Sequence, residues 1–164
     1  MTDRKANIKH LASLIKEVEI AMLTTTGAGG KLVSRPLGTQ QVEFDGDLWF
    51  ATGADSEKVD EIRADPRVNV AYASSGRNTY VSVSGKASIV SDRAKIEELW
   101  SPAMQIFFPE GKDDPNLRLI RVRAESAEYW DGPGTAIGKA LYLLVAAVSD
   151  DPGAMSDNET LRIR

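Results

Sequence analysis

The sequence predicts a mainly β protein with peripheral helices, and three observations lead to this fold class. About six apolar or β-branched runs are separated by short turns rich in Gly, Asp and Asn, as in antiparallel sheets. Only three or four segments have the apolar spacing of a helix. No strand–helix–strand rhythm recurs, so a doubly wound parallel sheet is not expected. A small antiparallel barrel with helices around it fits this pattern best.

The first helix is predicted at about residues 6–19, where apolar residues recur at helical spacing. A second short helix follows Asp55 or Ser56, and either side chain can cap it. A third is predicted at residues 92–100, with Ser91 as its cap.

The strands are separated by clear turn signals. Extended segments are predicted at residues 20–26, 31–44, 48–53, 67–74, 80–90 and 117–130. Glycines at 27–30 indicate a hairpin between the first two strands. Pro36 cannot donate to a sheet ladder, so its strand is expected at an edge or a bulge. If the tight turn at residues 45–47 makes the second and third strands neighbours, Arg35 comes close to the end of the third strand.

A length of 164 residues predicts one domain. We place it at residues 1–148, including a C-terminal helix whose apolar stripe runs from Ile137 to Val148. Residues 149–164 are polar and have little to bury, so they are expected to form a disordered tail.

Composition excludes several classes of function. Lys and Arg number 20 against 24 Asp and Glu, and a net charge of −4 argues against a nucleic-acid partner. The chain has no cysteine and one histidine, His10, so thiolate and multi-histidine metal sites are excluded. No apolar run reaches the roughly 20 residues of a membrane span, and no secretory signal is visible. We expect a cytoplasmic protein with no membrane partner and no metal.

The segment at residues 48–58 is the most informative for function. A strand runs into a turn of small residues and then into a helix, whose first N–H groups have no partner within the helix. These groups and the positive end of the helix dipole suit a phosphate, and Ser56 and Lys58 add a hydroxyl and a charge. The plainer interpretation is that Ser56 only caps the helix and that Lys58 is solvated.

Arg35 strengthens the anion-site hypothesis. An arginine within a strand is costly unless its charged end reaches solvent or a partner. If Arg35 and Lys58 converge on the helix start, together they form a better anion site than either alone. The alternative is that the stem of Arg35 merely covers apolar neighbours. The acids of this helix are expected to form a solvated face: Asp55, Glu57, Asp60 and Glu61.

These motifs together resemble a known family. Arg35-Pro36, then Trp-Phe-Ala-Thr at residues 49–52, Ser-Glu-Lys at 56–58 and Asp-Pro-Arg-Val at 65–68 are similar to the pyridoxamine 5′-phosphate oxidase-like, FMN-binding split barrels. The stretch at residues 107–115, followed by Glu-Tyr-Trp-Asp at 128–131, resembles their bacterial general stress protein branch. The resemblance covers about residues 7–132 and implies a six-stranded antiparallel split β-barrel.

The resemblance also implies a cofactor and a partner. It implies FMN, with FAD as an alternative, bound in a homodimer that has its flavin sites at the subunit interface. One subunit would contribute Arg35, Pro36, Phe50, Ala51, Thr52, Ser56 and Lys58. The other would contribute Trp130 and, with less support, Trp100 and Phe107. Aromatic residues such as these are more often part of a core than of a cofactor site. No residue is identified as a general acid or base.

The activity implied is that of a flavin-dependent oxidoreductase acting on an unknown small molecule. A flavin-binding stress protein that senses or stores its ligand without turnover is an alternative, as are a deazaflavin-binding split barrel and a dimer with no ligand. Oxidation of pyridoxamine phosphate itself is not expected. The enzymes of that activity have a basic C-terminal motif, whereas here the last strand ends Tyr129-Trp130-Asp131 without comparable Arg or His residues.

Overall fold

The computed structural model describes residues 4–40, 43–132 and 157–163. The strands are β1 (Ile20–Thr26), β2 (Leu32–Gly38), β3 (Asp47–Gly53), β4 (Arg67–Ser74), β5 (Thr79–Val90), β6 (Leu117–Asp131) and β7 (Asp157–Arg162). The helices are α1 (Arg4–Ile15), α2 (Glu57–Ala64) and α3 (Arg93–Leu99), with short 3₁₀ helices η1 (Ala28–Gly30), η2 (Pro102–Ile106) and η3 (Gly111–Asp113). The predicted fold class and all six predicted strands are confirmed, and β7 is an addition.

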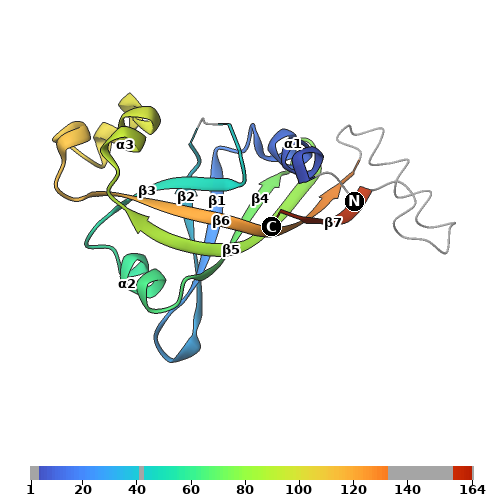
Figure 1. Cartoon of the computed structure of the whole chain (residues 1–164), viewed down its shortest axis with the longest axis horizontal. Helices are drawn as coiled ribbons and strands as arrows, with labels where there is room; N and C mark the ends of the chain where they lie inside the picture. The colour runs from blue at the N-terminus through green and yellow to red at the C-terminus, as the bar shows by residue number, and fades with distance from the viewer. Residues whose placement is uncertain (1–3, 41–42, 133–156, 164) are drawn as a thin grey trace, which may run out of the picture.

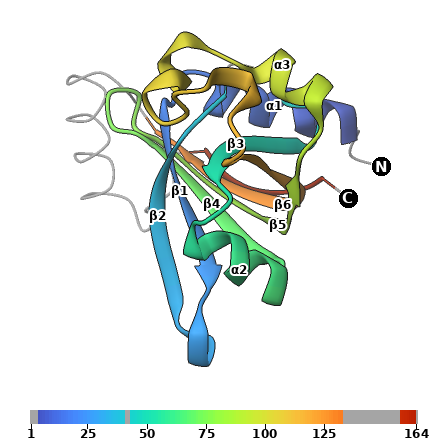
Figure 2. The same cartoon turned by 90° about the vertical axis from the view of Figure 1, so that its left-hand side faces the viewer.

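The strands form one curled antiparallel sheet in the order β2-β1-β4-β5-β6-β3, and β7 pairs with β6 beyond β3. The sheet curls until its end strands β2 and β3 come near each other, but they share no ladder of hydrogen bonds (Figure 1). This open seam makes the barrel a split one. Helices α1 and α3 lie above the sheet and α2 below it in both views, and the β1–β2 hairpin extends downward past α2 (Figure 2).

The expected pairing of the second and third strands is wrong. β2 pairs with β1, and β3 pairs with β6, with Phe50 opposite Ile120. β2 ends at Gly38 rather than at residue 44, because the chain leaves the sheet there and crosses to β3 through a longer connection. The expectation for Pro36 is confirmed, since β2 is an end strand and needs no donor on its outer edge.

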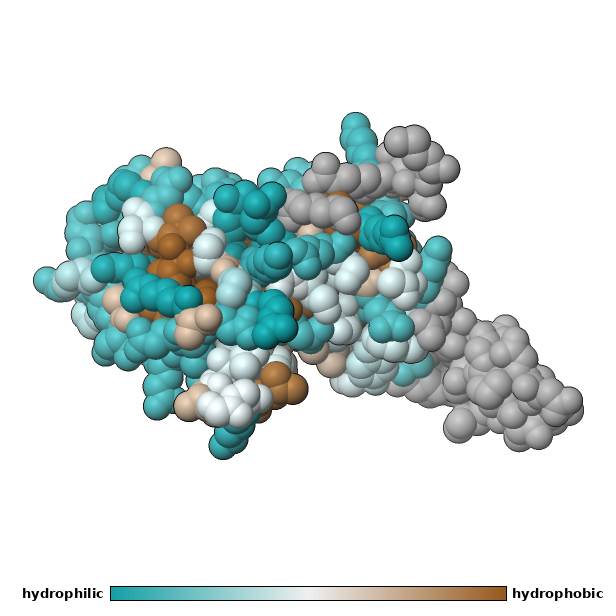
Figure 3. Space-filling model, turned by 60° about the horizontal axis from the view of Figure 1, so that its bottom comes forward, coloured by the Kyte–Doolittle hydropathy of each residue, from teal (hydrophilic) through white to brown (hydrophobic). Residues whose placement is uncertain are grey.

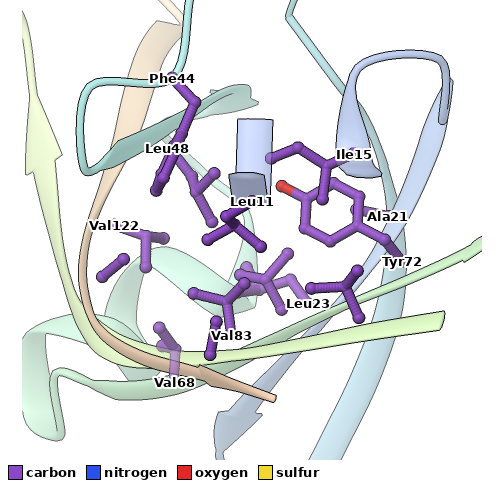
Figure 4. Packing of buried hydrophobic residues seen from close by; sticks show 14 of the residues in the cluster. Leu11, Ile15, Ala21, Leu23, Phe44, Leu48, Val68, Tyr72, Val83 and Val122 are labelled. Atoms are coloured by element: carbon purple, nitrogen blue, oxygen red, sulfur yellow. The ribbon is translucent and has the colours of Figure 1, made fainter. Parts of the chain in front are cut away.

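Apolar residues from α1 and the inner face of the sheet form the main core. Figure 4 shows Leu11 of α1 at the centre of this cluster, with Leu48, Val83 and Val122 around it. Buried and more exposed side chains alternate along most of β5, as expected for a sheet with one buried face. Gly85 marks a bulge between β5 and β6, where a Cβ would lie 2.3 Å from the Arg123 carbonyl oxygen. Only glycine allows this close approach.

A smaller core lies between α3 and the outer side of β3 and β6. Leu99 and Leu119 are buried in it, and Trp49, Ala51 and Trp100 pack against it. The cap of α3 is Asp92 and not Ser91, because the Asp92 carboxylate accepts the Lys95 N–H. Ser and Asp are both typical N-cap residues, so the sequence alone does not show which of the two caps the helix.

The expectation of a disordered tail is wrong for residues 157–163. Strand β7 pairs with the second half of β6, on the edge that β3 leaves open. Leu161 and Ile163 are buried in the main core, and the Ile163 N–H donates to the Glu125 carbonyl at 2.9 Å. The segment as a whole is polar, but these two apolar residues are enough to anchor it in the core. The predicted C-terminal helix at residues 137–148 lies outside the described residues.

Burial of Ile163 gives a test of this strand. Because its side chain is fully buried, Ile163→Ala is expected to lower the free energy of unfolding by about 2–4 kcal/mol, as large-to-small core substitutions do. Thr160→Ala, at an exposed position of β7 just before Ile163, should cost about 1 kcal/mol or less. Urea unfolding followed by circular dichroism measures both. Equal and small effects would show that β7 does not contribute to the core.

Candidate functional site

The candidate site lies at the start of α2, between the end of β3 and the β1–β2 hairpin. The register of the hairpin places Arg35 of β2 opposite Leu23 of β1, and α2 packs against β1. Arg35 therefore reaches α2 across β1 and not across β3. The predicted convergence of Arg35 and Lys58 on this helix is present, although the strand pairing expected to produce it is not.

Arg35 is held by two partners on the inner side of the hairpin. Its Nη1 donates to Glu61 Oε2 at 2.8 Å and to Thr25 Oγ1 at 2.9 Å, and Thr25 Oγ1 donates to the same carboxylate oxygen at 2.6 Å. The side chains of Arg35 and Glu61 are only 19% and 15% exposed. In the described part of the chain, Nε and Nη2 of Arg35 have no hydrogen-bond partner. Nη1 of the guanidinium is thus fixed by protein contacts, and the Nε–Nη2 edge can donate to a ligand.

Glu61 is the main functional candidate that the sequence analysis missed. It was expected on a solvated helix face, but its carboxylate lies between Arg35 and Thr25. The hydrogen bond from Thr25, and after it the one from Arg35, lowers the pKa of Glu61 below its ordinary value. Gly27 leaves room for this carboxylate, since a Cβ there would lie 3.2 Å from Glu61 Oε1. The available signal was the helical spacing, which puts Glu61 one turn after Lys58.

Lys58 and Ser56 form the second half of the cluster. Ser56 occupies the N-cap position of α2, but its side chain makes no capping bond. Its Oγ instead accepts from Lys58 Nζ at 2.5 Å, so the hydroxyl proton is free to be donated to a ligand. Burial, and next the nearby charge of Arg35, lowers the pKa of Lys58, while Glu61 and Asp55 oppose that shift. Lys58 therefore interacts electrostatically with both Arg35 and the Glu61 carboxylate.

Asn116 positions the turn between β3 and α2. Its carbonyl oxygen accepts the Ala54 N–H at 2.8 Å, and its Oδ1 accepts the Asp55 N–H at 3.3 Å. A Cβ at position 53 would lie 2.8 Å from Asn116 Nδ2, which explains the glycine there. The start of α2 is therefore fixed by the residue that precedes β6, a relation that no short motif in the sequence reveals.

The residues of β3 face two ways. Phe50 and Thr52 are buried toward the barrel interior, whereas Ala51 lies half-buried on the opposite side. The side chains of Phe50 and Thr52 thus belong to the interior of the protein, and a ligand beside this strand would meet its main chain. β3 has a strand partner on one edge only within the described chain, so its other edge faces the seam. Pro36 is exposed on β2.

A cavity of about 460 Å³ opens at the other end of β3. It lies between α1, the residues after β2 and the first half of β3, and its lining includes Ile15, Thr39, Trp49, Phe50 and Tyr72. Burial raises the pKa of the Tyr72 hydroxyl well above its usual value, so the hydroxyl stays neutral. Its lining combines apolar side chains with charged ones such as Lys16 and Asp47, so it offers both apolar contact and hydrogen bonds to a flat group.

The three remaining aromatic candidates do not join this cluster within one chain. Trp100 follows α3 and packs against the smaller core. Phe107 follows η2 and is 75% exposed, and Trp130 is 38% exposed on β6 opposite Tyr80. No group of three His, Cys, Asp or Glu side chains suited to a metal occurs among residues 4–40, 43–132 and 157–163. None of the helices in the same ranges is long and apolar enough to cross a membrane.

Comparison with known proteins identifies the family. A family model described as pyridoxamine 5′-phosphate oxidase like matches residues 6–152, which include the whole cluster at α2. The chain belongs to the pyridoxamine 5′-phosphate oxidase-like family. Protein bli-3 of Neurospora crassa is 29% identical over 164 residues, covering 94% of this chain and 78% of its own length.

Other relatives place the chain near the general stress proteins of this family. General stress protein 26 of Bacillus subtilis is 32% identical over 81 residues, which cover 48% of this chain and 57% of that protein. The structure of the general stress FMN/FAD binding protein of Xanthomonas citri superposes with a TM-score of 0.67 and 29% identity, covering 77% of this chain and 89% of that one. The resemblance to the pyridoxamine 5′-phosphate oxidase-like split barrels is thereby confirmed.

The partly buried carboxylate of Glu61 predicts a pH dependence of stability. Because the folded-state pKa of Glu61 lies below its ordinary 4.5, its ion pair stabilises the fold above pH 4.5 and loses this effect as the pH falls through the lower folded value. Glu61→Gln removes the charge and should remove this part of the pH dependence. Urea unfolding of both proteins between pH 7 and pH 3 measures it. A stability difference that is the same at all pH values would contradict the assignment.

Proposed function

We propose that this protein binds FMN, with FAD as an alternative, in a homodimer, and that it is a flavin-dependent oxidoreductase acting on a small molecule. The observation that carries this proposal is the convergence of Arg35, Lys58 and the start of α2 at the end of β3. The membership of the chain in the family supports it, as does the relative from Xanthomonas citri whose name includes FMN/FAD binding.

The cluster has the donors that a terminal phosphate needs. Arg35 offers the Nε and Nη2 edge, which matches two phosphate oxygens, and Lys58 adds a second charge. Ser56 offers its hydroxyl proton. The Val59 N–H turns back to the Ser56 carbonyl, so the N–H groups of Glu57 and Lys58 point out of the helix end. These residues would hold the phosphate of the flavin.

The rest of the flavin would follow β3 toward the cavity. From Gly53 to Leu48 the strand extends about 16 Å, at about 3.3 Å per residue. Its free edge offers main-chain donors and acceptors to the polar edge of the ring, and the cavity beside Trp49 and Tyr72 offers apolar surface. Phe50, Ala51 and Thr52 would thus contribute mainly through the backbone, and Pro36 would border the seam.

The outer face of the sheet is suited to a second copy of the chain. Met22 and Ile20 of β1 are 40% and 56% exposed, and Tyr80 and Trp130 form an exposed aromatic pair on β5 and β6. Large apolar side chains that gather on one sheet face mark an interface. The β1–β2 hairpin, which carries Arg35, protrudes from the body of the protein at the lower edge of Figure 3. In a dimer it would contact the second copy. Trp130, Trp100 and Phe107 would then approach the flavin from the partner.

When bound, the flavin would supply the redox chemistry, and the residues of this chain would bind and orient it. Arg35, Lys58 and Ser56 would hold the phosphate end, and the main chain of β3 would lie along the rest of the flavin. A small substrate would lie against the apolar part of the cavity lining, which includes Ile15, Phe44 and Leu48. The neutral Tyr72 hydroxyl is the polar group of that lining with the most restricted access to solvent.

Replacement of Lys58 tests the phosphate site. Lys58→Ala removes one charge-assisted contact and should weaken FMN binding about 10- to 100-fold, as loss of a charged hydrogen bond does. Lys9→Ala, on the exposed side of α1, is the matched control and should leave the affinity unchanged. Quenching of FMN fluorescence measures both dissociation constants. Wild-type affinity in Lys58→Ala would exclude Lys58 from the site.

Replacement of Met22 tests the dimer. Met22→Lys puts a charge at the centre of the proposed interface and should convert the dimer to a monomer at micromolar concentration. Ala6→Lys, at an exposed position of α1, should leave the dimer intact. Light scattering after size exclusion gives the mass of each protein. A wild-type protein that is monomeric when saturated with flavin would rule out a shared site.

A further inference from the structure

We infer that the cavity beside the first half of β3 binds a small, flat, uncharged carbonyl compound, and that the Tyr72 hydroxyl donates a hydrogen bond to its carbonyl oxygen. Tyr72 is then a specificity-determining residue, separate from the phosphate cluster at α2. The inference rests on the proposed function, because it names the substrate class of the proposed oxidoreductase. Binding in the cavity can nevertheless be measured in the absence of flavin.

The Tyr72 hydroxyl is a buried donor without a partner from the described protein. The residue lies on β4 and is 5% exposed, and in the part of the chain that the structure describes its hydroxyl makes no hydrogen bond. Figure 4 shows its ring extending inward, with the oxygen on the side of Ile15 and Leu11 of α1. Buried polar groups normally have a hydrogen-bond partner. A phenylalanine would fill the same space, so the hydroxyl indicates a partner that enters the cavity.

Among the described lining residues, the two other hydroxyls are already used by the backbone. Ser13 Oγ donates to the carbonyl oxygen one helical turn before it at 2.6 Å, and Thr39 Oγ1 donates to the Val18 carbonyl oxygen at 2.6 Å. Burial raises the pKa of the Tyr72 hydroxyl, so this group keeps its proton at neutral pH and can donate it. A carbonyl oxygen is an acceptor suited to that proton.

The size and the aromatic part of the lining suit a flat molecule. The cavity volume of about 460 Å³ lies within the usual range of small-molecule sites. Aromatic rings pack well against the face or the edge of another ring. The lining has aromatic side chains at Phe44, Trp49, Phe50 and Tyr72.

The charges of the lining favour an uncharged ligand. Asp47 is buried, and its Oδ2 accepts from Arg121 Nε at 2.7 Å, so the charge of this carboxylate is already compensated. Lys16 and Glu43 are both exposed and opposite in charge. An anion in the cavity would lie near two carboxylates and one ammonium group, and would gain no net attraction from them.

The test measures how the carbonyl of the ligand and the hydroxyl of Tyr72 depend on each other. The probes are 1-indanone, which has one carbonyl on a flat ring system, and indane, which lacks it. Each is titrated into flavin-free wild type and Tyr72→Phe, and backbone amide shifts in NMR spectra give its location and its dissociation constant. Tyr72→Phe should weaken binding of 1-indanone about fivefold, as loss of a neutral hydrogen bond does, and change that of indane by less than about twofold.

Ser13→Ala is the matched control. It removes a hydroxyl of the same lining, but one that is already bonded to a backbone carbonyl. It should change the affinity for either probe by less than about twofold. Each protein is compared with wild type for the same probe, because the two probes also differ in their hydration. Tyr72→Phe loses no described bond to the protein and should keep the fold, which circular dichroism verifies.

A second pair of probes tests the preference for a neutral molecule in the wild-type protein. Indane-1-carboxamide and indane-1-carboxylate have nearly the same shape, and only the carboxylate is charged at neutral pH. The carboxylate should bind at least about tenfold more weakly, because the lining does not compensate its charge or its lost hydration. Equal affinities for the two would overturn the assignment of an uncharged ligand.

The outcomes separate this inference from the proposed function, because FMN binding is measured on the same samples. The inference is overturned if wild type does not bind 1-indanone, if the shifts lie outside the cavity, or if Tyr72→Phe affects both probes equally. Loss of 1-indanone binding in FMN-saturated protein also overturns it, since the flavin ring would then take the cavity. Each of these results leaves FMN binding standing. A protein that shows the Tyr72 effect but binds no FMN overturns the proposed function and the substrate role, while the cavity site stands.

Discussion

The ion pair between Arg35 and Glu61 joins the end strand of the sheet to the helix that carries Lys58, and the candidate site depends on it. Thr25, buried in the neighbouring strand, completes the contact by bonding both partners. Without this network, two cations and a helix end would lie close together with only the exposed Asp55 to offset their repulsion. The network places them at the open seam of the barrel, where a ligand can reach them.

The split of the barrel leaves one edge of β3 open beside this cluster. A closed barrel would pair β2 with β3 and use up the backbone groups of both. In the described chain these two strands end the sheet, so one edge of β3 is left without a strand partner and leads from the cations to the cavity. Asn116 fixes the turn at one end of that edge. One anionic end and one flat apolar end are what a flavin nucleotide presents to a protein.

Local patterns in the sequence predicted the strands well, because apolar alternation and glycine turns act over a few residues. Pairing between distant strands was not accessible in this way, and the neighbour assumed for β2 was wrong. Arg35 was assigned to the site by an incorrect route, since it reaches α2 across β1. Glu61 was taken for a solvated acid because the sequence does not show which side of a short helix meets Thr25. The burial of Ile163 was missed because it depends on the pairing of β7 with an open edge of β6, which the sequence does not show.

The central claim is that the Arg35–Lys58 cluster grips a phosphate, and the affinity of the wild-type protein for FMN relative to riboflavin tests it most directly. The two ligands share the ring and the ribityl chain and differ only in the phosphate. Charge-assisted contacts from Arg35 and Lys58 predict that FMN binds about 100-fold tighter or more, and that added salt reduces the difference. Equal affinities for the two, at any salt concentration, would contradict the account.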